Sequence, residues 1–331
     1  MKTLFSAFIA LIALGFSTGG WAACTLPAST ASFGTASSFT VNSTVSTTTS
    51  EAQVNCGSGS ILSLLGTNSV TLRLASASAV AVGNSRGTMK RAGDVGPDNI
   101  PVMLCSTSNC TPEMTIGATA VTYNSTQLGN LVGLLGGLNF TFPLYLRTVP
   151  GQTVAAGTYT VTLNIAVTYR ICTGINIGGI CVALSDQNGS GTIPLTVTMV
   201  VTNDCTTINS TNISFGSAPL VSSFSPVSQS VSVYCTKGST YTVGISNGAH
   251  AVGNVRNMAS GSNLLAYEIY KGSTTDRWGP AGAERWTSTA SSGVSTDGVT
   301  RTYLYTAKVL PTQNTPAAGS YTDTVVVDLT F

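Results

Sequence analysis

The segment 159–169, "YTVTLNIAVTY", decides the fold class of this chain. Apolar and aromatic residues occupy every second position, with threonine, asparagine or alanine between them. A period of two is typical of a β-strand with one buried and one exposed face. The predicted inward residues are Tyr159, Val161, Leu163, Ile165, Val167 and Tyr169.

The block that leads into this strand occurs twice. "PGQTVAAGTYTVT" (150–162) returns as "PTQNTPAAGSYTDT" (311–324), so Tyr321 stands where Tyr159 does. The alternation then continues to the end of the sequence, with Asp323 as the exception. Its further predicted inward residues are Val325, Val327, Leu329 and Phe331.

Two more blocks are repeated in the same order. A segment with Cys as its second residue, Phe-Gly inside it and Val-x-Cys at its end spans 23–56 and again 204–235. "VGNSRGTM" (82–89) likewise matches "VGNVRNM" (252–258). Three repeated blocks in one order predict two homologous domains.

We place these domains at residues 23–203 and 204–331. No window of the sequence predicts a convincing amphipathic helix. Threonine, serine, valine and glycine dominate, which favours an all-β protein exposed outside the cell. The predicted architecture is therefore all-β, with two β-sandwiches.

Composition excludes several classes of protein. Only 8% of the residues are charged and the net charge is +2, so the sequence predicts no patch for nucleic acid. The apolar content of 43% argues against disorder.

Residues 1–22 have the features of a secretory signal peptide. Lys2 precedes an apolar run from Leu4 to Phe16, and Gly20-Trp21-Ala22 forms a small-x-small cleavage site. One alternative is a lipoprotein acylated at Cys24, although Trp21 fits that signal poorly. The other is a membrane anchor, for which the apolar run is short.

The eight cysteines of an exported chain favour disulfides over thiols or metal sites. Because they occupy equivalent places in the repeat, we expect Cys24 to pair with Cys56 and Cys205 with Cys235. The remaining four have no counterparts in the second domain and are expected to close two short loops. These pairs are Cys105 with Cys110 and Cys172 with Cys181.

The two domains differ in their final strand. After the first domain's equivalent strand, "TIPLTVTMVV" (192–201) alternates again and predicts one more strand, whereas the second domain ends at Phe331. A sandwich without this strand would expose unpaired backbone and apolar core. It either uses one strand fewer or is completed by a strand from another chain.

The Cys–Phe-Gly–Cys opening, the Gly-Asn-x-Arg block and the Ala-Ala-Gly-[Ser/Thr]-Tyr-Thr ending resemble the spore coat protein U family, which includes subunits of archaic chaperone–usher (Csu-type) pili. The resemblance covers both domains. It implies an incomplete immunoglobulin-like sandwich that a neighbouring subunit completes with a donated N-terminal strand. It also implies a periplasmic chaperone and an outer-membrane usher as partners. The terminal strand that carries Val325, Val327, Leu329 and Phe331 would line the groove and contact the chaperone.

In such pili, shaft subunits carry an extension before the first Cys that fills the neighbour's groove. Cleavage after Ala22 would leave one residue before Cys24, so we expect this chain to accept a strand without donating one. It is then expected to be secreted through the periplasm and to end as a tip adhesin on the cell surface. An ordinary structural subunit without its own binding site is the alternative.

Three apolar, glycine-containing segments of the first domain are predicted to be exposed loops that bind a hydrophobic abiotic or host surface and support biofilm formation. Glycine spacing disfavours a core for them, but core packing remains an alternative. A membrane span at 128–146 is a third reading, disfavoured by four glycines and Pro143. The predicted surface-binding residues are Ile61, Leu62, Leu64, Leu65, Leu131, Val132, Leu134, Leu135, Leu138, Ile175, Ile177 and Ile180.

Other functions have weaker support in the sequence. The single histidine, His250, has no nearby nucleophile motif, and we expect neither enzymatic activity nor a cofactor. "GDVGPDN" (93–99) lacks the spacing of a calcium loop. A carbohydrate-binding adhesin is the main competing hypothesis, because Trp278 and Trp286 could stack on sugars. Both lie in the second domain, however, where the resemblance implies no receptor site.

Overall fold

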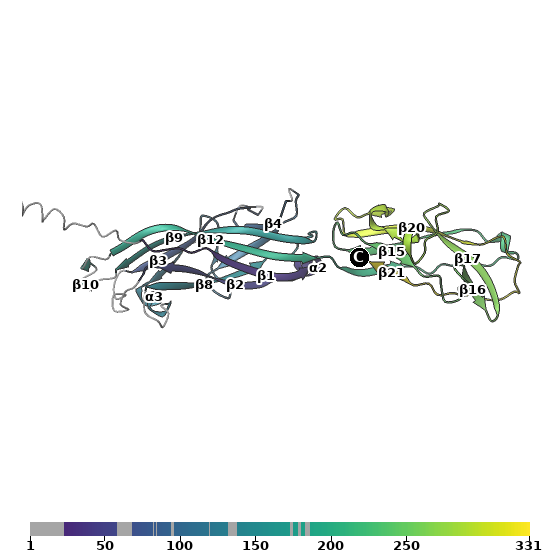
Figure 1. Cartoon of the computed structure of the whole chain (residues 1–331), viewed down its shortest axis with the longest axis horizontal. Helices are drawn as coiled ribbons and strands as arrows, with labels where there is room; N and C mark the ends of the chain where they lie inside the picture. Colours follow the sequence, from purple (N-terminus) through teal and green to yellow (C-terminus); the bar gives the residue numbers. More distant parts are fainter. Residues whose placement is uncertain are drawn as a thin grey trace, which may run out of the picture.

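The computed structural model describes residues 23–57, 68–131 apart from 82, 84, 94, 95 and 119, and 138–331 apart from 173–174, 178–179 and 183–185. For residues 130, 175–177, 180–182 and 186 it describes the backbone alone. The two sandwiches lie end to end along the long axis of the molecule (Figure 1).

The first sandwich contains residues from Cys24 to Thr202. Its main path of paired strands runs β1-β12-β9-β4-β5-β8-β2, and β3, β6 and β7 pair beside it. The short hairpin of β10 and β11 follows β9. The strands are β1 (Ser29–Ser37), β2 (Thr47–Asn55), β3 (Ser69–Ala77), β4 (Gly87–Arg91), β5 (Ile100–Cys105), β6 (Glu113–Met114), β7 (Ala120–Asn124), β8 (Asn139–Thr148), β9 (Gly157–Cys172), β10 (Ile175–Ile177), β11 (Ile180–Val182) and β12 (Asp186–Thr202).

Strand β9 confirms the alternation that the sequence predicts. Its odd-numbered residues from Tyr159 to Tyr169 are all buried, and the residues between them are exposed or half-buried. Three strands pair with it directly, namely β12, β3 and β4. The segment quoted first is thus the central strand of this sheet.

Strand β12 lies between β1 and β9 and pairs with both. It runs parallel to β1, with Ala31 opposite Val197, and antiparallel to β9, with Val161 opposite Val197. Its inward residues are buried, as the alternation in 192–201 predicts. They are Ile193, Leu195, Val197, Met199 and Val201.

The second sandwich has two smaller sheets. One has the order β13-β14-β20-β17-β16, with β19 beside β20, and the other has the order β18-β15-β21. The strands are β13 (Cys205–Ser210), β14 (Val227–Cys235), β15 (Thr242–Ile245), β16 (Arg256–Ser260), β17 (Asn263–Lys271), β18 (Trp286–Thr287), β19 (Gly293–Val294), β20 (Thr300–Val309) and β21 (Val327–Thr330).

Each sandwich has a core of its own. The large cluster of buried apolar residues in the first draws only on residues 24–201, and the clusters of the second draw only on residues 205–329. Polar and aromatic contacts join the two sandwiches. Ser38 donates to Thr236 at 3.0 Å, and the rings of Phe39 and Tyr234 stack with centroids 4.9 Å apart.

Two features differ from the sequence predictions. The described part of the first sandwich includes the short helices α2 (Ser38–Ser43) and α3 (Ser125–Leu131), which the sequence did not predict. Helix α2 begins after Ser37, whose side chain accepts from the Thr40 amide as an N-cap. The terminal strand is also shorter than predicted, because regular pairing is confined to Val327–Thr330.

Among the described side chains, disulfides join Cys24 to Cys56, Cys105 to Cys110 and Cys205 to Cys235. Cys172 is also disulfide-bonded, and its expected partner, Cys181, lies outside the described side chains. No helix among the described residues is long and apolar enough to cross a membrane. Residues 139–146 of the span considered in the sequence lie in strand β8.

Candidate strand-binding groove

Two pairs of equivalent residues relate the edges of the two sandwiches. The Tyr159 hydroxyl donates to the carbonyl of Ala155 at 2.8 Å, and the Tyr321 hydroxyl donates to the carbonyl of Ala317 at 2.6 Å. Each bond runs four residues back along the chain, as a corner tyrosine does in immunoglobulin-like sandwiches. The segment after Tyr321 therefore corresponds to β9.

The Phe-Gly step marks the other edge in the same way. Gly34 has φ of 72° and Gly216 has φ of 74°, a left-handed conformation that favours glycine. Their amides donate to Ser32 Oγ at 3.0 Å and to Ser214 Oγ at 3.4 Å. Segment 211–216 therefore corresponds to β1.

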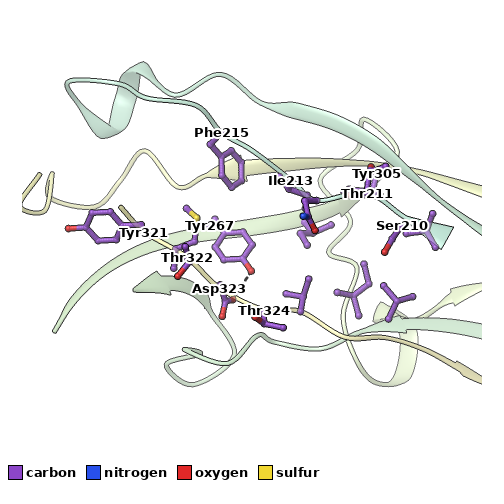
Figure 2. Close-up of a pocket in the computed structure, with 17 residues that line it drawn as sticks. Ser210, Thr211, Ile213, Phe215, Tyr267, Tyr305, Tyr321, Thr322, Asp323 and Thr324 are labelled. Atoms are coloured by element: carbon purple, nitrogen blue, oxygen red, sulfur yellow. Dashed lines mark hydrogen bonds between the residues drawn. The ribbon is translucent and has the colours of Figure 1, made fainter. Parts of the chain in front are cut away.

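In the first sandwich β12 lies between these two edges, whereas in the second sandwich a groove lies between them. The groove has a volume of about 420 Å³ and is bounded by segments 210–215 and 321–327. Figure 2 shows Phe215 and Ile213 on one side and Tyr321 to Thr324 on the other. A second hollow of about 610 Å³ continues it and shares Ile213, Phe215, Met258 and Tyr321.

The terminal segment is paired along one side. Its even-numbered residues bond to neighbouring segments of the same sandwich. The amide of Thr322 donates to Ala259, and the carbonyls of Thr324 and Val326 accept from Ala249 and Ser246. The described contacts include no hydrogen bond to the backbone of Asp323 or Val325. One edge of the groove thus presents unpaired backbone groups.

The opposite edge is also open. Strand β13 pairs with β14 alone and ends at Ser210, and residues 211–216 continue outside any strand. Ile213 and Phe215 are half-buried against the core, and the Phe215 ring lies edge-on to Tyr267 with centroids 6.0 Å apart. Two open edges above an apolar floor are the geometry that β-strand addition requires.

One polar cluster interrupts the apolar lining. The Tyr267 hydroxyl donates to Asp323 Oδ2 at 2.7 Å (Figure 2), and the amides of Ala249 and His250 donate to Oδ1 at 2.9 and 3.2 Å. A Cβ on Gly248 would lie 2.0 Å from Oδ2, so glycine is required there. Burial, and then the Asp323 carboxylate, raise the pKa of Tyr267, which keeps its hydroxyl a donor.

The four predicted residues of the terminal strand do not share one environment. Val325 and Val327 line the groove and, with Leu329, pack partly against the second core. Phe331 is 64% exposed and lies edge-on to Tyr241, with ring centroids 6.1 Å apart. The groove's second edge and Tyr267 were not predicted from the sequence, although the repeated Phe-Gly step was a usable signal for that edge.

The predicted surface loops need one correction. Leu138 is fully buried, because it leads into β8 and is the first of the inward residues that continue with Phe140 and Phe142. Its backbone is bonded to Cys56 and Gly57, which fixes it in the core. Leu131, at the end of α3, is half-buried against the same core.

The other predicted surface residues are only partly described. Ile175, Ile177 and Ile180 belong to the hairpin of β10 and β11, whose backbone alone is described. Figure 1 places β10 at the pole of the first sandwich that faces away from the second. The residues outside the described part of the chain are Ile61, Leu62, Leu64, Leu65, Val132, Leu134 and Leu135.

The tryptophans do not offer a sugar-binding face. Trp278 is fully buried and Trp286 is 8% exposed, and their rings pack edge-to-face with centroids 5.1 Å apart in the second core. Stacking on a carbohydrate requires an accessible ring, so this part of the carbohydrate hypothesis is wrong. Among the described residues, no group of three or more His, Cys, Asp or Glu could hold a metal ion.

Comparison with solved structures yields similar pilus proteins at low identity. One is the CsuC–CsuE chaperone–tip adhesion subunit complex of Acinetobacter baumannii, at 23% identity over 93% of this chain and 100% of that one, with a TM-score of 0.48. The CupB6 tip adhesin of Pseudomonas aeruginosa has 11% identity over 89% of each chain and a TM-score of 0.38. The CooA pilin subunit of enterotoxigenic Escherichia coli has 16% identity over 53% of this chain and 99% of that one, with a TM-score of 0.29.

Sequence comparison gives the family. No curated protein matches the chain. A family model described as the Spore Coat Protein U domain matches residues 13–166 and, a second time, residues 192–328. The second match begins inside β12, so the strand that completes the first sandwich stands at the start of the second repeat. The chain belongs to the Spore Coat Protein U domain family.

Proposed function

We propose that this chain is a chaperone–usher pilus subunit that accepts a strand from another subunit in the groove of its second sandwich. The strongest support comes from comparing the two sandwiches of the chain with each other. Strand β12 fills the space between β1 and β9, and the corresponding space between 211–216 and 321–327 is a groove with two open edges.

The same observation indicates which segment of the adjacent subunit supplies the incoming strand. Strand β12 precedes Cys205, the first cysteine of the second repeat, and it completes the sandwich that comes before it. By analogy, the donor is the segment before the first cysteine of an adjacent subunit. A periplasmic chaperone protects the groove until an outer-membrane usher assembles the fibre.

The finer proposal is a tip adhesin. The first sandwich already contains its own completing strand, so one groove per chain remains for assembly. The hairpin of β10 and β11 lies at the opposite pole (Figure 1), where it is free of the second sandwich. We assign surface attachment and biofilm formation to the apolar segments near this pole, including Ile175, Ile177 and Ile180.

Adding the missing strand tests the assembly role. A copy of residues 190–201, attached after Phe331 through a flexible linker, should fill the groove and raise the yield and unfolding temperature of the periplasmic protein. A copy with a scrambled sequence is the matched control. Equal stability with both copies would contradict the proposal.

Labelling tests the position of the chain. Antibodies against the first sandwich should mark the ends of pili in electron micrographs. Labelling along the shaft would instead favour a structural subunit without its own binding site. Attachment to polystyrene by cells that lack this chain should fall if the tip adhesin is responsible.

A further inference from the structure

The two repeats differ in polarity at one inward position of the edge that the completing strand contacts. Counting from the equivalent tyrosines Tyr159 and Tyr321, the first sandwich has Val161 where the second has Asp323. Val161 is buried and lies opposite Val197 of β12. The occupant of the second groove therefore meets a carboxylate where β12 meets an isopropyl group.

The register of the first sandwich identifies the position on the incoming strand. Val197 pairs with Val161 on one side and with Ala31 on the other. The Phe-Gly equivalence places Ile213 where Ala31 stands. One inward side chain of the occupant thus reaches the space between Asp323 and Ile213, both of which line the groove.

Asp323 keeps one acceptor site for that side chain. An ionised carboxylate offers about four lone-pair sites. Two amides occupy Oδ1, and the Tyr267 hydroxyl occupies one site of Oδ2. Among the described residues that line the groove, none is basic and Asp323 is the one charged residue.

Covering the groove changes the environment of this carboxylate. The added strand removes water from Oδ2, and an acceptor that loses water without gaining a donor is costly. A valine at the matching position would impose that cost, whereas a hydroxyl or ammonium group would replace the lost water. A donor at this position is therefore favoured over an apolar residue.

We propose that Asp323 and Tyr267 form a polar subsite that selects a hydrogen-bond donor, such as Ser, Thr or Lys, at one inward position of an otherwise apolar donor strand. This inference rests on the proposed function. The subsite also fixes the register, because a shift by two residues would bring an apolar side chain to the carboxylate and move the donor into an apolar pocket. The groove thus distinguishes between strands of similar hydrophobicity.

Isosteric changes on the appended strand test the subsite. The copy of residues 190–201 after Phe331 is made with Val or with Thr at the position that corresponds to Val197, since the two side chains differ by a methyl and a hydroxyl. We expect the Thr copy to raise the folded-to-unfolded ratio of the second sandwich about tenfold over the Val copy in urea titrations. In Asp323→Val the order should reverse.

Two further variants keep the test decisive. The matched control has Thr at the position of the appended strand that corresponds to Leu195. This side chain would face Val325, so the Thr should weaken binding in both backgrounds. If Asp323→Val does not fold, Asp323→Asn retains an acceptor for the two amides while removing the charge, and the preference for Thr should fall.

The outcomes separate the two proposals. Stabilisation by both copies without a difference between Val and Thr would overturn the polar subsite and leave the strand-accepting groove intact. If neither the Val copy nor the Thr copy is more stabilising than the scrambled control, the proposed function itself is overturned. A Thr preference that survives Asp323→Val would also overturn the subsite.

Discussion

The Nζ atom of Lys237 lies 2.5 Å from Oδ1 of Asp98, so an ion pair connects the second sandwich to the first. The Asp98 side chain is 7% exposed and also accepts from the amide of Ala155 at 2.9 Å. The carboxylate is therefore anchored in its own sandwich, and the partly exposed lysine reaches it from the other. The ion pair thus joins the two sandwiches through a short polar contact.

Lys237→Met should loosen this joint with little effect on either fold. A partly exposed ion pair contributes about 0–1 kcal/mol to stability. We expect unchanged unfolding temperatures but a broader distribution of maximum dimensions in small-angle X-ray scattering. Lys308→Met, whose ammonium lies over the Tyr270 ring in the second sandwich, is the control. A scattering curve identical to that of the parent would mean that Lys237 does not restrain the joint.

Arg256→Met should destabilise the second sandwich strongly. The guanidinium is fully buried, pairs with Glu268 and donates to the carbonyls of Ser246, Ile245 and Trp278 at 2.8–2.9 Å. Its loss leaves a buried carboxylate and three carbonyls with fewer partners, which costs about 3–5 kcal/mol. Urea titration of the second sandwich measures this directly.

The repeat supplies a matched control for this change. Arg86 stands at the corresponding place of the first sandwich and pairs with Glu113, but its side chain is 35% exposed. Arg86→Met should therefore cost about 1 kcal/mol or less. Equal decreases in the free energy of unfolding of the two sandwiches would show that burial does not determine how much this repeated arginine stabilises its domain.

The sequence predicted the parts of the fold that depend on period and repetition. Alternation identified the inward faces of β9 and β12. Successive side chains of any strand point to opposite faces, so this pattern can be read from the sequence without knowing the tertiary structure. The repeat identified equivalent cysteines and tyrosines. Glu113 and Glu268 were not found, since the partner of a charged side chain depends on tertiary pairing that no local pattern contains.

The errors have a physical cause as well. Leu138 follows a glycine-rich run, and the composition of that run placed it in a loop, although Phe140 and Phe142 continue its alternation. Its backbone bonds to residues 56 and 57 place it at the start of β8 instead. Trp278 and Trp286 stand among polar residues in the sequence, and only the sheet packing reveals that they fill a core.

Substitutions in the apolar segments should separate adhesion from folding. Replacing Leu134 and Leu135 by Ser should reduce attachment to polystyrene while the unfolding temperature stays unchanged, if these residues bind the surface. Leu138→Ala is the contrasting variant, because truncating a buried leucine costs about 2–5 kcal/mol and should lower the unfolding temperature. Destabilisation by the Ser substitutions would place these leucines in the core, and full stability with full attachment would move the binding site elsewhere.

The terminal strand offers the sharpest comparison between an inward and an outward position. Val325 and Val327 line the groove, whereas Val326 between them is 60% exposed. Val325→Thr and Val327→Thr introduce hydroxyls into the apolar contact with the incoming strand without changing β-propensity much. We expect each to weaken the complex with the chaperone about tenfold, and Val326→Thr to leave its affinity unchanged. Co-purification from the periplasm followed by titration measures these affinities. If Val326→Thr weakens the complex as much as its neighbours do, the chaperone contacts the outer face of the strand, and the groove is not its binding site.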